Sequence, residues 1–131
     1  MEHLERRMAD CATHLEAVEC WIRGMLARAQ EPHRPTDTRP FVLNGMRLAY
    51  EFPAESLAVD EALRAPLREA LRQAAAAGEL TEPDIGRDVA HIVQLTLGHM
   101  TWSLIQRDPL RPADVDDVVA FALAGLRRRG T

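Results

Sequence analysis

The residues best suited to chemistry in this chain are two cysteines and a pair of histidines on a helical segment. Cys11 and Cys20 stand nine residues apart, and both fall in stretches with helical patterning. Two thiols could respond to oxidants, but this separation along helices places them poorly for a disulfide bond. We therefore expect reduced thiols that fill space in the core, not a disulfide framework.

The histidines do not form a metal motif. His91 and His99 are eight residues apart, whereas a helical metal pair places its two histidines one turn apart. No cysteine or further carboxylate completes a ligand set around them. Asp88 precedes His91 by about one turn, so we expect a histidine beside an acid. The sequence predicts no metal site and no cofactor.

Motifs of catalysis and of nucleic-acid binding are missing from the sequence. There is no nucleophile elbow, no His-Glu metal helix and no phosphate loop. The acid pairs Asp60-Glu61 and Asp116-Asp117 fall at predicted helix starts, where the helix dipole favours negative charge. The arginines at 127–129 suit the end of a helix and are too few for a DNA footprint. We expect a protein that is not an enzyme.

The size and composition are those of one soluble domain. The chain has 131 residues, of which 47% are hydrophobic and 27% charged, with a formal net charge of -4. This length suffices for one domain over residues 1–131 with a real core. Apolar stretches are far shorter than the ~20 residues of a membrane span. No charged-then-apolar leader opens the sequence, so we expect a cytoplasmic protein.

Apolar residues recur at helical spacing and never alternate, which predicts an all-α fold of about six helices. The pattern places a first helix from Glu2 to about Ala12, with a possible break at Thr13-His14, and a second from Leu15 to Gln30. A third is capped within Thr36-Asp37-Thr38 and ends near Pro53, and a fourth runs from about Ser56 to Ala77 with Gly78 as its C-cap. Pro66 should kink or break that fourth helix.

Two long antiparallel helices between Thr81 and Arg129 close the chain. Thr81 is the expected cap of the first, whose apolar run reaches Ile105, and Pro112 opens the second. Each helix has a second stripe beside the one that lines its own core. These second stripes comprise His91, Leu95, Gly98, Trp102 and Ile105 on the first helix, and Asp117, Phe121, Ala124, Gly125 and Arg128 on the second.

A second apolar stripe needs a second partner. In so small a chain, the simplest partner is another copy of the same two helices. Gly98 and Gly125 would let the backbones approach closely. We therefore expect a homodimer with a four-helix interface.

The order of several short motifs resembles the regulatory half of TetR-type transcriptional regulators. These are residues 38–49 (TRPFVLNGMRLA), Phe52-Pro53, residues 65–70 (APLREA), residues 78–80 (GEL), Gly98, and residues 124–126 (AGL). The resemblance covers nearly the whole chain. It implies a four-helix dimer interface from the last two helices and a pocket for a small, largely apolar effector enclosed by the preceding ones.

The candidate pocket residues are apolar or flexible side chains with two polar anchors, Thr96 and Ser103. The full set is Trp21, Met25, Phe41, Met46, Ile92, Thr96, Met100 and Ser103. Methionine and aromatic side chains line adaptable apolar cavities well. The alternative is that these residues simply fill the core.

The resemblance implies a ligand-sensing and dimerisation domain of a repressor. Its DNA contacts would come only through a helix-turn-helix domain that this chain does not contain, since Glu2 to Gln30 lacks the spacing of that motif. The chain would then be part of a longer protein or a relative without a DNA-reading head. The alternative function is a helical dimerisation module that binds no ligand and acts through protein–protein contacts.

Overall fold

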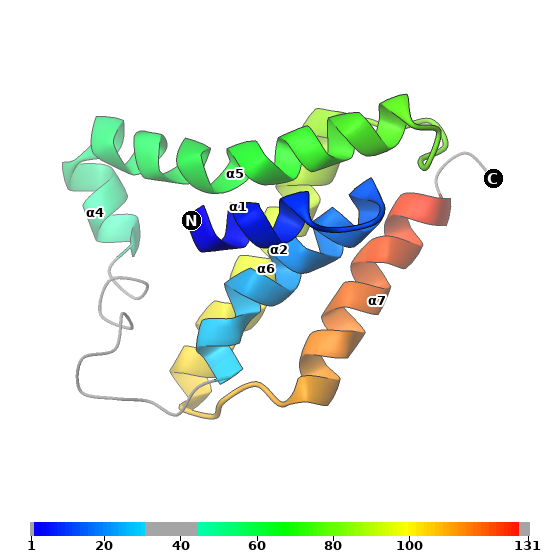
Figure 1. Cartoon of the computed structure of the whole chain (residues 1–131). Coiled ribbons are helices and arrows are strands. Elements are labelled where there is room, and N and C mark those ends of the chain that lie inside the picture. Colours follow the sequence, from blue (N-terminus) through cyan, green and yellow to red (C-terminus); the bar gives the residue numbers. More distant parts are fainter. Residues whose placement is uncertain (1, 31–44, 129–131) are drawn as a thin grey trace.

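The computed structural model describes residues 2–30 and 45–128 of the chain. Within these ranges the protein is all-helical, as predicted, and has no strand (Figure 1). The six described helices are α1 (Glu2–Ala9), α2 (His14–Gln30), α4 (Gly45–Glu51), α5 (Pro53–Ala76), α6 (Ile85–Gln106) and α7 (Pro112–Arg128). The predicted caps at 36–38 lie outside the described residues.

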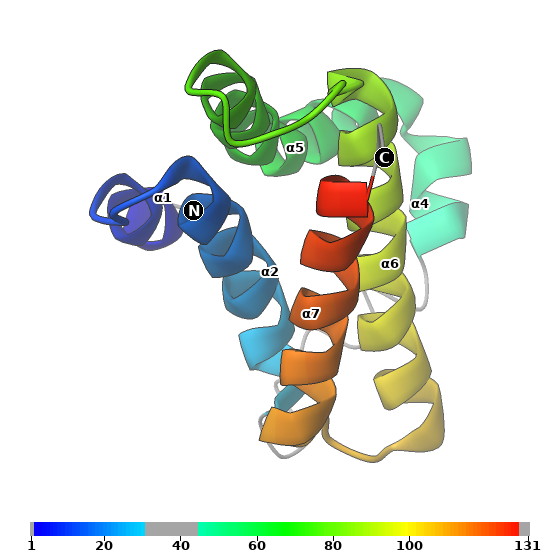
Figure 2. The ribbon, with the colours of Figure 1, turned by 90° about the vertical axis from the view of Figure 1, so that its right-hand side faces the viewer.

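Helix α2 lies at the centre of the fold. It packs against α1, α5, α6 and α7, and α5 crosses over one end of α2, α6 and α7 (Figure 2). Val18, Trp21, Ile22 and Leu26 of α2 are fully buried, because their spacing places them along the face that meets the other helices. Helices α6 and α7 are antiparallel to each other, as predicted, and both pack against α2 (Figure 2).

Helix α5 continues through Pro66, so of the two predicted outcomes, a kink or a break, the break does not occur. Leu67 and Leu71, on the C-terminal side of the proline, are fully buried in the core that α5 shares with α2. On the N-terminal side, the indole Nε1 of Trp21 donates a hydrogen bond to the Leu63 carbonyl at 3.1 Å. Packing on both sides of Pro66 offsets the backbone hydrogen bond that proline cannot make.

The start of α6 also differs from the prediction. Asp84, not Thr81, caps the helix, and its side chain accepts a hydrogen bond from the Arg87 backbone N–H at 3.2 Å. The reason lies just before: Glu82 has a left-handed backbone with φ 49°, and a residue that precedes a proline is disfavoured in a right-handed helix. The helix therefore begins only after Pro83.

Helix α1 is shorter than predicted and ends at Ala9. The chain then reverses over residues 10–13, and Thr13 caps α2 by accepting from the Glu16 N–H at 3.1 Å. Glu79, in the connection between α5 and α6, adds a second cap. Its carboxylate accepts from the backbone N–H groups of His14 at 3.2 Å and Leu15 at 3.1 Å. Two segments far apart in sequence thus fix the start of α2.

The turn between α6 and α7 is tied to the far end of α2. Arg107 adopts a left-handed conformation with φ 56°, and the hydroxyl of Ser103 donates to the Asp108 carbonyl at 2.6 Å. The backbone N–H of Leu110 then donates to the Ala29 carbonyl at 2.8 Å. None of the described helices is long and apolar enough to cross a membrane.

Candidate functional site

The outer surface of α6 and α7 carries large apolar side chains that the other described helices leave uncovered. Trp102 is 58% exposed and Phe121 is 72% exposed, and Ile105 on the same stripe of α6 is also exposed. All three belong to the predicted second stripes. Burying aromatic side chains of this size is worth ~1.5–3 kcal/mol each, so the isolated chain leaves considerable free energy unused on this surface.

The other predicted interface residues lie on the same surface. His91, Gly98, Asp117, Ala124 and Gly125 are exposed, Leu95 is half-buried, and the side chain of Arg128 is not among those described. A shallow depression of about 540 Å³ runs along this surface between the two helices. It is lined by Leu95, His99, Trp102, Gln106, Leu110, Asp114, Asp117, Val118 and Phe121. We call this surface the α6–α7 face.

Most of the described candidates for the effector pocket are core residues in this structure. Trp21, Ile92, Thr96 and Ser103 are buried, and Met25 and Met100 are partly buried against the core. Phe41 lies outside the described residues, and Met46 lies on α4 with a side chain that is not described. Neither of the two described cavities is lined by any of these eight residues.

The polar groups among these candidates differ in whether they have a hydrogen-bond partner. The Trp21 indole and the Ser103 hydroxyl donate to backbone carbonyls, so both have structural partners. The Thr96 hydroxyl is fully buried and has no hydrogen-bond partner. Burying such a group without a partner costs ~1–3 kcal/mol, so among the described candidates the Thr96 hydroxyl is the polar group still available to a ligand.

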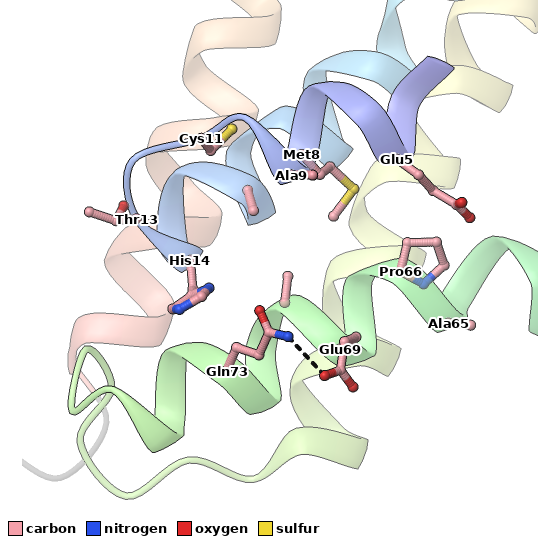
Figure 3. Close-up of a pocket in the computed structure, with 12 residues that line it drawn as sticks. Glu5, Met8, Ala9, Cys11, Thr13, His14, Ala65, Pro66, Glu69 and Gln73 are labelled. Atoms are coloured by element: carbon pink, nitrogen blue, oxygen red, sulfur yellow. Dashed lines mark hydrogen bonds between the residues drawn. The ribbon is translucent and has the colours of Figure 1, made fainter. Parts of the chain in front are cut away.

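A separate cavity of about 320 Å³ lies between α1, α2 and α5 (Figure 3). Glu5 and Met8 approach it from α1, His14 from the start of α2, and Glu69 and Gln73 from α5. The Gln73 side-chain amide donates to Glu69 at 3.0 Å, which orients both side chains along one wall. Sequence reasoning missed this cavity because it forms only where the chain folds α1 back over α5.

The two cysteines meet in the same region, and the prediction that they are poorly placed to bond is wrong. Their sulfur atoms lie 3.2 Å apart, and both thiols are free. Cys11 is not on a helix but in the reversal after α1, which carries it back beside Cys20 on α2. The possible break at Thr13-His14 was the available signal that the two residues do not share one straight helix.

The surroundings of Cys11 disfavour its charged form. Burial is the largest of several causes that together raise the pKa of this thiol to about 11; the others are the hydrogen bond and repulsion from Cys20 and the charges of Glu16 and Asp10. Its Sγ also lies 3.3 Å from the Arg7 carbonyl, to which it donates. Cys11 is therefore protonated at neutral pH.

Within residues 2–30 and 45–128, no three histidine, cysteine or acidic side chains gather as metal ligands would. His91 and His99 are exposed on α6, whereas Asp88 is buried and accepts from the Asp84 N–H at 3.3 Å. His91 lies on the α6–α7 face, and His99 lines its depression.

Comparison with family models, curated proteins and solved structures finds no match to this chain. The fold and the sites therefore define only a class: an all-helical protein with an uncovered apolar face on its last two helices and a separate cavity beside a thiol pair. Any more specific function has to be argued from these features.

Proposed function

We propose that this chain is a homodimerisation and ligand-sensing domain of the kind found in TetR-like transcriptional repressors. The observation that carries the proposal is the α6–α7 face, where Trp102, Ile105 and Phe121 are exposed on two adjacent antiparallel helices. Contiguous exposed apolar surface with a polar rim is typical of protein–protein interfaces. A second copy of the chain presents the same surface and would complete a four-helix interface.

The glycines on this face support close contact with another backbone. A Cβ at Gly98 or Gly125 would meet no atom within 4 Å, so the chain itself does not require glycine at either position. Glycine inside a helix costs roughly 0.5–1 kcal/mol relative to alanine. Close approach of a partner helix explains why that cost is tolerated.

The ligand-sensing part of the proposal rests on Thr96. This buried, unpartnered hydroxyl lies on α6 among apolar core residues such as Ile92 and Val93. A largely apolar effector with one polar atom would satisfy the hydroxyl and contact the apolar wall. Since α6 also carries the interface, an effector that prefers one position of α6 would shift the dimer between two arrangements.

Control of DNA would need a separate helix-turn-helix head in the same protein. A dimer reads two half-sites at a fixed spacing, so a change in the separation of two heads weakens simultaneous docking. In this proposal the effector acts on DNA only through the dimer geometry.

Sedimentation at micromolar concentration tests the dimer, with Gly98→Leu as the disruptive variant. We expect the wild-type chain to be dimeric and Gly98→Leu to weaken association by roughly tenfold or more. Gly86→Leu is the matched control, because Gly86 is also on α6 and also open, but points about 120° away from Gly98 around the helix. A monomeric wild type, or a Gly98→Leu variant that dimerises normally, contradicts the proposal.

The alternative function is dimerisation without a ligand, and one observation favours it: Trp21 and Ser103 of the predicted pocket are buried and already donate to backbone carbonyls. A thermal-shift screen with small apolar compounds separates the two functions. Saturable stabilisation of the dimer supports ligand sensing, since a ligand that binds only the folded state raises its melting temperature. A dimer that no compound stabilises supports the alternative.

A further inference from the structure

We propose that Cys11 and Cys20 form a redox-sensitive dithiol that closes to an intramolecular disulfide within the native fold. The sulfur atoms already lie 3.2 Å apart. A disulfide bond measures about 2.05 Å, so the two atoms need to approach by only about 1.2 Å. This inference requires neither the dimer nor an effector and stands apart from the proposed function.

The backbone around the pair permits that approach. Cys20 is held on α2, but Cys11 lies in the irregular connection over residues 10–13, outside both helices. A small adjustment of this connection closes the gap without unwinding a helical turn. The bond would exchange the weak thiol hydrogen bond between the two residues for a covalent link.

The pair is also accessible to a small oxidant. Both cysteines are half-buried, and Cys11 is one of the residues lining the cavity between α1, α2 and α5 (Figure 3). The raised pKa of Cys11 makes its own attack on an oxidant slow. In the reaction below, Cys20 makes the first attack, and Cys11, whose sulfur lies 3.2 Å from that of Cys20, resolves the mixed disulfide.

The oxidant we assign is a low-molecular-weight disulfide. The Cys20 thiolate attacks one sulfur of this compound, so that a mixed disulfide forms and one small thiolate leaves. Cys11 then gives up its proton, and its sulfur attacks the Cys20 sulfur of the mixed disulfide, releasing the second small thiolate. The two thiol protons end on the two released thiols, so two protein thiols are oxidised and one small disulfide is reduced. Proximity compensates for the low thiolate fraction of Cys11 in the second step.

The experiment is equilibration of the purified chain in buffers with varied ratios of oxidised to reduced glutathione, followed by alkylation and intact mass measurement. We expect a product that is lighter by two hydrogen atoms, takes up no alkylating agent and yields a peptide linking Cys11 to Cys20. The same titration in urea gives the equilibrium for the unfolded chain. Because the fold holds the sulfurs together, the folded chain should favour the disulfide by roughly tenfold or more over the unfolded one.

Single-cysteine variants provide the control. Cys11→Ser and Cys20→Ser should each end as a mixed disulfide with glutathione, because the resolving partner is missing. The proposal is overturned if the wild-type thiols stay reduced. It is also overturned if each cysteine ends bound to its own glutathione or to a second chain. A Cys11–Cys20 disulfide that forms no more readily in the folded chain than in urea overturns it as well.

Discussion

At the scale of single residues, Cys11 shows how the fold alters the chemistry of a side chain. Its thiol has a pKa raised from 9.0 to about 11, first by burial and then by Cys20 and nearby carboxylates. At pH 8 its thiolate fraction is therefore roughly a hundredfold lower than that of an ordinary thiol with a pKa of 9.0. We expect iodoacetamide to alkylate Cys11 slowly in the folded chain and faster in urea, as measured by peptide mapping.

The same shift predicts the effect of alkaline pH on stability. The pKa of Cys11 is higher in the folded than in the unfolded chain, so the folded state holds this proton more tightly. That contribution is fully present below about pH 9 and is lost as the pH rises through about 11. Cys20→Ser removes a neighbour that raises the pKa of Cys11. The variant should therefore lose less unfolding free energy than the wild type between about pH 9 and 11. An equal loss in both chains would show that Cys20 does not act on Cys11.

Thr96→Val tests the buried hydroxyl. Valine keeps the shape of threonine and removes the unpartnered group, so the ligand-free chain should become more stable by about 1 kcal/mol in a urea titration. A compound that hydrogen-bonds Thr96 should lose most of its stabilising effect on this variant. If the variant is destabilised instead, the hydroxyl has a structural role and does not await a ligand.

At the scale of elements, Glu79 links the connection before α6 to the start of α2. Its carboxylate accepts hydrogen bonds from the His14 and Leu15 N–H groups. Glu79→Ala should cost about 1–2 kcal/mol of unfolding free energy, because it removes a charged acceptor from a helix N-terminus. Glu82→Ala, an exposed acid in the same connection, is the matched control and should change stability by less than about 0.5 kcal/mol. Equal costs would contradict the capping role.

The helices themselves followed from sequence because their cause is local. The periodic apolar residues predicted α2 and α7 to within a residue of their bounds at most ends, and Gly78, with φ 77°, lies just beyond the end of α5 as a C-cap should. The prediction that Thr81 caps α6 was wrong. Glu82 has a left-handed backbone and precedes a proline, so the helix begins only after its cap, Asp84. A continuous α5 through Pro66 depends on packing against α2, which spacing along one helix does not encode.

The candidate sites were less predictable than the helices. The exposed stripes of α6 and α7 followed from periodicity, since each residue's direction on a helix depends only on its position. The approach of Cys11 to Cys20 and the cavity beside them depend on a chain reversal at residues 10–13. Neither the direction of that reversal nor the neighbours it creates can be read from residue spacing.

At the scale of the whole molecule, the α6–α7 face predicts that stability depends on protein concentration. A dimer that buries Trp102 and Phe121 gains stability by mass action, so its melting temperature should rise with concentration. We expect a rise of several degrees over a hundredfold increase in concentration, measured by calorimetry, and a much smaller rise for Gly98→Leu. A melting temperature independent of concentration in the wild type would indicate a chain that is stable alone.

Helix α1 has one buried side chain, Met8, and the helix forms one wall of the cavity between α1, α2 and α5. So few buried groups give this segment a small free energy of local opening, well below that of the core around Trp21. The cavity therefore exists only in the subpopulation in which α1 is docked. Any compound that occupied it would contact α1 together with α2 and α5, and would therefore reduce the local opening of α1.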